Sequence, residues 1–446
     1  MRALAAVALG AGLALLLWFA GGPREARRFA DSESYLDCAR QPLGIDFFFS
    51  TRAPLAPGPT PALEDGIYRN RPPLVPLLYR ACGLDPARIV AVQTLLYAAG
   101  AATGIVLLAG ACAATRPGRL ALGALLAALA LTWNLSGWTR TLLSEATVLA
   151  LLWLFLGATA DALARARRLS LAAAVAAAWA LMFARDSAAF LVVPVLAGAL
   201  VAARLGVRRD LTRPLAAALV VVLAGAGLAQ WGMLRGQRAE LPLLNVLFFR
   251  IAPDPAALDW WRARGLPWSP ELEPFRGRYA FERDLEIFRS PAHRPLRDWF
   301  EQRGRGLYVR FLLTHPGFVA RETARGAGDL FGADLATYIG APPPGVHGGL
   351  DRLTRLAPAW VCAAALALAL AALRLRHAPL APIDLLPFAV ALAFLVHGLA
   401  VFHADAAEPE RHCFPTLIGL QLAALLALAR GFAARRPARG ERAAAA

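Results

Sequence analysis

Long blocks of apolar residues, separated by shorter polar stretches, fill most of the chain. Residues 3–20 and 215–233 carry almost no polar side chain, and about 20 consecutive apolar residues suffice to cross the hydrocarbon core of a membrane. The sequence therefore predicts an all-α polytopic membrane protein with about ten transmembrane helices. The expected spans are residues 3–20, 89–113, 120–136, 142–162, 169–183, 187–203, 214–233, 356–373, 381–402 and 413–430.

The blocks divide the chain into three parts. These are a transmembrane core (1–233) with a long first external loop (21–88), a second external segment (234–355), and a C-terminal part (356–446) with the last transmembrane helices and a basic cytoplasmic tail. Between residues 291 and 329 the spacing of Trp299, Phe311 and Phe318 indicates helices with one apolar face. We expect short amphipathic helices on the outer leaflet or on the bundle, and a compact soluble cap is an equally open alternative.

The composition narrows the class of partner. Only 17% of the 446 residues are charged, against about 25% in a typical soluble domain. The net charge of +16 would suggest nucleic acid for a soluble protein, but in a membrane protein it is typical of loops that face anionic lipid. We therefore expect membrane lipids and no nucleic acid as partners. All 47 basic residues are arginines, which is typical of GC-rich bacterial genomes and predicts the bacterial cytoplasmic membrane.

The arginines also predict the orientation. With Met1 in the cytoplasm, seventeen arginines fall in inside segments, and only Arg140, Arg185 and Arg411 fall in the short outside loops. Because cytoplasmic loops are enriched in basic residues, both termini are expected inside and both long segments outside.

Charged residues gather at the predicted outer ends of the spans. Asp31, Glu33 and Tyr35 follow the first span. In a helix Asp31 and Tyr35 would share a face and Glu33 would point away. A partly desolvated carboxylate beside arginines can act as a general base, although an ordinary solvated acid is the simpler interpretation of the spacing alone.

A second feature of the first loop is Arg71 in the run Arg71-Pro72-Pro73-Leu74-Val75-Pro76. The prolines predict an extended, non-helical backbone over residues 71–76. An arginine held by a stiff segment suits a phosphate group, because its planar fork makes paired charge-assisted hydrogen bonds. Contact with a lipid head group is the alternative.

The other short external loops repeat the pairing of arginine with carboxylate. They contain Arg140 with Glu145, Arg185 with Asp186, and Glu408 with Arg411 and His412. Each pair alone is a weak signal, because helix ends often carry charges. Together they indicate an anionic ligand at one membrane face.

In their order and sidedness these motifs resemble those of the GT-C superfamily of membrane glycosyltransferases, which includes protein mannosyltransferases and aminoarabinose transferases. The resemblance covers residues 1–233 and 356–430. It is carried by Asp31-Ser32-Glu33-Ser34-Tyr35, the Arg71–Pro76 run, Leu143-Ser144-Glu145, Ala184-Arg185-Asp186, and Glu408 with Arg411-His412.

The resemblance implies transfer of a sugar from a polyprenyl-phosphate donor to a lipid, glycan or protein acceptor on the non-cytoplasmic side. It implies Asp31 as general base, Glu33 as a second acid, and a site for the donor phosphate at Arg71, Arg185, Arg411 and His412. Supporting roles fall to Tyr35, Arg140, Glu145, Asp186 and Glu408. Some family members hold a divalent metal with such an acidic motif, so a metal is an open alternative here. The sugar and the acceptor are not indicated.

Two other functions compete with transfer. A transporter or flippase of an anionic lipid or lipid-linked sugar would share the external arginines, but it should carry polar residues deep in its spans. Away from their ends, the expected spans contain few strongly polar residues, namely Gln93, Gln230, His397 and Gln421. A non-catalytic scaffold of cell-envelope assembly would explain the topology but not the repeated acid–arginine loops.

Overall fold

The structure is a computed structural model, and its described residues are 2–20, 26–49, 71–206, 208–236, 238–282, 286–331, 335–343, 346–375 and 381–433. Residues 21–25 and 50–70 of the expected first loop, and 434–446 of the basic tail, lie outside them. Within these ranges every regular element is helical, and Arg27 and Thr141 form one isolated β-bridge. The predicted all-α class is therefore confirmed.

Six helices in the described residues are long and apolar enough to cross a membrane. They comprise α5 (Pro86–Cys112), α8 (Glu145–Arg165), Asp186–Leu205 with α10 (Ala189–Leu205), Asp210–Arg235 in α11 (Arg209–Arg235), Pro382–Ala404 with α22 (Leu386–Ala404), and Pro409–Gly431 with α23 (Pro409–Cys413) and α24 (Pro415–Ala433). The chain is thus a multi-pass membrane protein. Three shorter apolar helices, α1 (Arg2–Ala20), α9 (Arg168–Ala184) and α21 (Ala357–Leu375), coincide with other expected spans, so the predicted number of ten remains a prediction.

The span predicted over residues 120–136 is broken. Helix α6 (Arg116–Leu131) ends at Thr132, whose ψ of 147° leaves the helical range, and the chain turns by 60° into α7 (Trp133–Ser136) and η1 (Gly137–Arg140). The indole of Trp133 then donates a hydrogen bond to the Gly340 carbonyl (2.9 Å). The apolar run continues through the break, so hydropathy alone could not reveal it.

The transmembrane helices share one hydrophobic core, in which α5 packs on α8 and α1, α10 on α22, and α22 and α21 on α24. Helices α5 and α8 approach closely because Gly104 has no side chain, and a Cβ there would overlap the Trp153 carbonyl. Small residues at such a contact let two helix backbones pack tightly in a membrane.

A second hydrophobic core lies in the segment that follows α11. It is formed by helices between residues 240 and 325, which we call the cap: α12 (Glu240–Val246), η3 (Leu247–Ile251), α13 (Pro255–Arg262), η4 (Pro270–Phe275), α14 (Glu286–Arg289), α15 (Arg294–Trp299), η7 (Phe300–Gly304), α16 (Arg305–Thr314) and α17 (Pro316–Arg325). Phe311 and Phe318 are buried in this core, so the segment follows the compact alternative.

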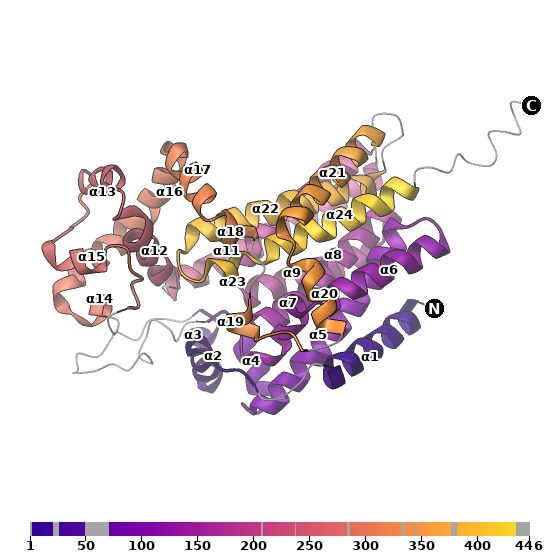
Figure 1. Cartoon of the computed structure of the whole chain (residues 1–446), viewed down its shortest axis with the longest axis horizontal. Coiled ribbons are helices and arrows are strands. Elements are labelled where there is room, and N and C mark those ends of the chain that lie inside the picture. The colour runs from indigo at the N-terminus through magenta and orange to yellow at the C-terminus, as the bar shows by residue number, and fades with distance from the viewer. Residues whose placement is uncertain are drawn as a thin grey trace, which may run out of the picture.

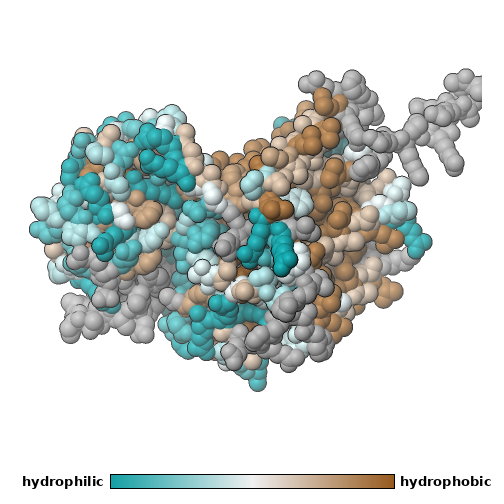
Figure 2. Space-filling view, in the orientation of Figure 1, coloured by the Kyte–Doolittle hydropathy of each residue, from teal (hydrophilic) through white to brown (hydrophobic). Residues whose placement is uncertain are grey.

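Figure 1 shows how the two parts are arranged. The start of α1 and the end of α24 lie at one end of the bundle, and the cap lies beyond the other. In Figure 2 the cap surface is largely hydrophilic, whereas apolar residues dominate the bundle around α21 and α24. The short helices α2 (Ala30–Arg40), α3 (Ile45–Phe49) and α19 (Ala336–Ile339) lie between the termini and the cap, nearer to the cap.

The predicted extended backbone over residues 71–76 is wrong in its second half. Helix α4 (Leu74–Ala81) begins directly after Pro73 and includes Pro76. Proline is tolerated there because the first turn of a helix has no intrahelical partner for its N–H groups. Arg71 and Pro72 precede the helix and remain non-helical.

Candidate functional site

Helix α2 presents Asp31 from its first turn. The Ser32 hydroxyl accepts a hydrogen bond from the Phe29 N–H (2.9 Å), which holds the start of the helix. Asp31 and Tyr35 share a face, as predicted. Tyr35 is buried, with the Arg71 guanidinium 5.0 Å from its ring centroid. Glu33 is exposed and faces Arg28 (3.4 Å) on the surface, so it lies outside the site described below.

Both oxygens of the Asp31 carboxylate are held by arginines. Arg71 donates from Nη2 to Oδ1 (2.5 Å), and Arg411 donates from Nη1 to Oδ2 (2.8 Å). Arg71 also donates from Nε to the Ser34 hydroxyl (2.8 Å), which orients its fork. The Asp31 side chain keeps 21% of its surface exposed, so this ion pair faces an opening.

Glu145 holds two arginines from the buried side. It is the first residue of α8, and its carboxylate is fully buried. Its Oε1 accepts from Arg411 Nε (2.9 Å) and from Arg185 Nη1 (3.1 Å). Its Oε2 has no hydrogen-bond partner among the described residues. Because an unpaired buried carboxylate is costly, the arrangement depends on both arginines.

The link between α9 and α10 sends two neighbouring side chains to different partners. Arg185 donates from Nη2 to His412 Nδ1 (2.6 Å). Arginine has no acceptor, so Nδ1 must accept, and neutral His412 then carries its proton on Nε2. Asp186 instead accepts two hydrogen bonds from Arg238 (2.7 and 2.9 Å) at the base of the cap.

The last member comes from the turn before α23. Glu408 adopts a positive φ of 50°, a conformation that a non-glycine residue holds only at a cost of about 1–3 kcal/mol. Its carboxylate accepts from Arg411 Nη1 (2.7 Å). Arg411 thereby contacts three acids, and it is the centre of what we call the arginine–carboxylate cluster: Asp31, Arg71, Glu145, Arg185, Glu408, Arg411 and His412.

The charges of the cluster balance, with three carboxylates against three arginines. Burial alone would raise the pKa of the Asp31 carboxyl, but Arg71 and Arg411 more than offset it and hold that pKa well below its ordinary value. Burial raises the pKa of Glu408, although Arg411 opposes the shift. A further anion can therefore join only if a carboxylate leaves its arginines or takes up a proton.

Next to the cluster lies Asp405, a residue that the sequence motifs did not single out. Its Oδ2 is 3.9 Å from His412 Nε2, and its Oδ1 accepts from Asn245 of the cap (3.3 Å) and from the Ala407 N–H (2.9 Å). No arginine within the described ranges lies in ion-pair contact with it. Burial raises the pKa of Asp405 to about 6.

One predicted residue is held away from the cluster, and one unpredicted residue, Tyr338, lies beside Arg411. Arg140 was predicted to support the site, but it donates to the Leu17 carbonyl (3.3 Å) and lies over the Trp133 ring. Tyr338 was not predicted, and its hydroxyl donates to Glu410 (3.2 Å) while its ring stacks on Trp138.

The described residues do not support the metal alternative. No three His, Cys, Asp or Glu side chains in the described ranges come close enough together to hold an ion. Asp31 and Glu33, the acidic pair of the motif, diverge to different partners. We therefore assign no step to a metal.

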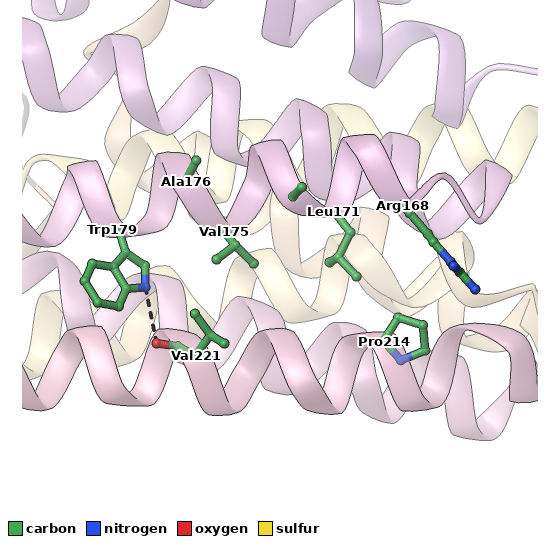
Figure 3. Close-up of a pocket in the computed structure, with 8 residues that line it drawn as sticks. Arg168, Leu171, Val175, Ala176, Trp179, Pro214 and Val221 are labelled. Atoms are coloured by element: carbon green, nitrogen blue, oxygen red, sulfur yellow. Dashed lines mark hydrogen bonds between the residues drawn. The ribbon is translucent and has the colours of Figure 1, made fainter.

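A groove of about 510 Å³ lies elsewhere, between α9 and α11 (Figure 3). Leu171, Val175 and Trp179 line one side, and Trp179 donates from its indole to the Val221 carbonyl (3.2 Å). Arg168 is its one charged lining residue. The groove runs toward the Arg168 end of α9, away from Arg185, so it does not belong to the cluster.

Comparison with family models, with curated proteins and with solved structures found no match to this chain.

Proposed function

We propose that this protein is a membrane glycosyltransferase of the GT-C type, which passes a sugar from a polyprenyl-phosphate donor to an acceptor at the outer face of a bacterial cytoplasmic membrane. The observation that supports it best is the position of Asp31 on Arg71 and Arg411 (2.5 and 2.8 Å), where the Asp31 side chain stays partly exposed. A carboxylate between two guanidinium groups occupies the place that a phosphate would take.

In this proposal the donor phosphate displaces the Asp31 carboxylate from Arg71 and Arg411. Arg411 is fixed from behind by Glu145, and Arg71 is fixed by Ser34. Both guanidinium groups therefore stay in place when Asp31 moves away. Preorganised donors of this kind stabilise the negative charge that grows on a leaving phosphate without further rearrangement.

The exchange also prepares the base. While Asp31 is held by two arginines, its low pKa makes it a poor proton acceptor. Once the phosphate binds both arginines, they no longer lower the pKa of Asp31, and burial raises that pKa again. Asp31 then accepts the proton of the acceptor hydroxyl. The hydroxyl oxygen bonds to the anomeric carbon, and the bond from that carbon to the phosphate oxygen breaks, which releases polyprenyl phosphate.

The test is sugar transfer by the purified chain from polyprenyl-phosphate-linked sugars. Asp31→Asn keeps the shape but removes the basicity, and we expect turnover to fall about 10²–10⁴-fold while the protein stays folded. Asp37→Asn is a matched control on the same helix, because Asp37 pairs with Arg40 on the surface, and it should retain activity. Wild-type turnover by Asp31→Asn would refute the base. A wild type that moves no sugar from any such donor would refute the transferase.

The proposal requires the cluster to lie on the non-cytoplasmic face. The cap adjoins the cluster through Asn245 and Asp405 (3.3 Å), so both must share one side of the membrane. A reporter fused near residue 290 should therefore be external, and one at Ala446 cytoplasmic. A cytoplasmic signal from residue 290 would contradict the assignment.

A further inference from the structure

Three aromatic rings form a stack on the surface of the cap. The Tyr279 ring is nearly parallel to that of Phe249 (centroids 4.7 Å apart, 15° between planes) and to that of Phe281 (5.3 Å, 14°). Phe249 is 41% exposed, and the other two rings are partly exposed. We call Phe249, Tyr279 and Phe281 the aromatic stack. Tyr279 and Phe281 pack against the cap core on one side, so folding of the cap accounts for only part of the surface of the stack.

The aromatic stack is tied to the arginine–carboxylate cluster by a short chain of contacts. The Ala280 N–H, between two of the stacked residues, donates to Asn245 Oδ1 (2.8 Å). Asn245 donates in turn to Asp405 Oδ1 (3.3 Å), and Asp405 Oδ2 lies 3.9 Å from His412 Nε2. The stack therefore lies beside the cluster, and on its cap side.

The charge on this side differs from that around Asp31. Glu282 accepts from the Tyr279 N–H (3.1 Å). Burial, and next Glu410, raise the pKa of the Tyr279 phenol, while Arg250 lowers it, so groups of both signs act on this ring. Asp405 lies on the chain of contacts that joins the stack to the cluster. Hydroxyl groups can donate hydrogen bonds to the carboxylates of Glu282 and Asp405.

We propose that the aromatic stack binds a pyranose ring of a neutral glycan, and that this glycan is the acceptor. The inference rests on the proposed transferase and names its acceptor class. The C–H face of a pyranose is flat and apolar and packs on an exposed aromatic ring, while its hydroxyls need polar partners. Glu282, which accepts from the Tyr279 N–H, supplies one such partner. The stack lies on the cap side of the cluster, so the bound ring lies on that side too.

The test is saturation-transfer NMR on the full chain in lipid nanodiscs, with maltotetraose, chitotetraose and mannotetraose as probes. We expect saturation to reach the ring C–H protons of at least one tetrasaccharide. Phe249→Ala should weaken that signal about 3- to 10-fold, which corresponds to the loss of one aromatic contact. Phe190→Ala is the matched control, because Phe190 on α10 is equally exposed (43%), and it should leave the signal unchanged.

Three results would overturn the glycan site: no transfer to any of the three tetrasaccharides, an unchanged signal in Phe249→Ala, or saturation exchanged between the aromatic stack and lipid alone. Undecaprenyl phosphate is added to the same samples, because its binding distinguishes a failure of the glycan site from a failure of the proposed function. If undecaprenyl phosphate binds and no glycan does, the acceptor site is wrong. If a glycan binds through Phe249 and undecaprenyl phosphate does not bind, the donor site is wrong instead.

Discussion

Helix α8 carries a buried acid near each end, and the two acids have different surroundings. We call these ends inner (Asp161) and outer (Glu145), after the proposed topology. At the inner end Asp161 pairs with Arg165, one turn further along the same helix, and accepts from Ser170 (2.6 Å). At the outer end Glu145 holds Arg185 and Arg411, which come from two other parts of the chain. A local ion pair of this kind can stabilise the end of a helix without any ligand. The outer arrangement gathers charge from five segments at high desolvation cost, and such clusters are typical of functional sites.

The inner end repeats its simple pattern in a second pair. Asp384 and Arg430 face each other (2.5 Å), and their other hydrogen bonds are to backbone groups, the Ala381 N–H and the Cys112 carbonyl. At the outer end, by contrast, Arg411 contacts three carboxylates, and a fourth, Asp405, lies nearby without an arginine of its own in the described ranges. The contrast suggests that the inner pairs serve stability and that the outer cluster serves binding.

The largest expected effect is the loss of Glu145. Glu145→Gln leaves Arg185 and Arg411 without their buried partner, which should cost about 3–5 kcal/mol of unfolding free energy. Asp161→Asn should cost less, about 1–3 kcal/mol, because the Arg165 side chain is 19% exposed and also donates to the Gly110 carbonyl. Thermal unfolding in one detergent compares the two variants. Equal losses would remove the distinction between the two ends.

The next effect concerns pH. The pKa of Asp405 is raised from 3.8 to about 6, so folding favours its protonated form. The contribution of this group to the free energy of unfolding is fully present below about pH 4 and is lost as the pH rises through 6. A shift of two pKa units corresponds to about 3 kcal/mol. Melting temperatures between pH 4 and 7 should show this slope in the wild type. Asp405→Asn cannot ionise and should flatten it, and an unchanged slope would mean that another group titrates.

A comparable or smaller effect is expected for Arg71. Its side chain is 19% exposed, so Arg71→Ala should fold and lose one charge-assisted contact to the donor phosphate, worth about 1.5–3 kcal/mol in binding. Arg71→Lys should recover only part of it, because lysine lacks the paired donors. Binding of undecaprenyl phosphate measures both variants, with Arg430→Lys at the inner end as the control. Wild-type affinity in Arg71→Ala would exclude Arg71 from the site.

The smallest effect is expected on the cap surface. Arg276 and Glu273 form an exposed pair (2.8 Å), and such pairs contribute about 0–1 kcal/mol. Arg276→Ala also loses a hydrogen bond to the Ala252 carbonyl, so a change near the upper end of this range is expected. A larger loss of stability would show that exposed ion pairs outside the cluster contribute more to the free energy of unfolding than is expected here.

The helices followed from the apolar blocks, because hydrophobic length is a direct requirement for crossing a membrane. The break at Thr132 did not, since the apolar run of α6 continues into Trp133 and Leu135. The extended backbone predicted over residues 71–76 was wrong from Leu74 onward, because proline is excluded from the interior of a helix but not from its first turn.

The site residues could be predicted where it was enough to know on which side of the membrane a loop lies. Asp31, Glu145, Arg185 and Arg411 lie near predicted outer ends of spans and Arg71 lies in the first external loop, and the structure brings all five together. Direction within a short turn was not predictable, so Arg140 points elsewhere. The helical spacing did predict that Glu33 would point away from Asp31, and only the family resemblance had assigned Glu33 to the site.

Asp405 lies in the acidic run before the last expected span, but the sequence did not distinguish it from the other acids of that run. Its surroundings depend on Asn245, which lies 160 residues earlier in the chain, and no local pattern can indicate such a contact. The same holds for Arg238, which follows α11 and reaches Asp186.

The central claim is that Asp31 occupies, in this structure, the place of the donor phosphate. The most direct test is the affinity of the purified chain for undecaprenyl phosphate, with undecaprenol as the uncharged control, in wild type and in Asp31→Asn. Removing the competing carboxylate frees Arg71 and Arg411, so Asp31→Asn should bind undecaprenyl phosphate about tenfold tighter or more, with undecaprenol unchanged, although the variant no longer transfers sugar. Equal or weaker binding of undecaprenyl phosphate by Asp31→Asn would contradict the account.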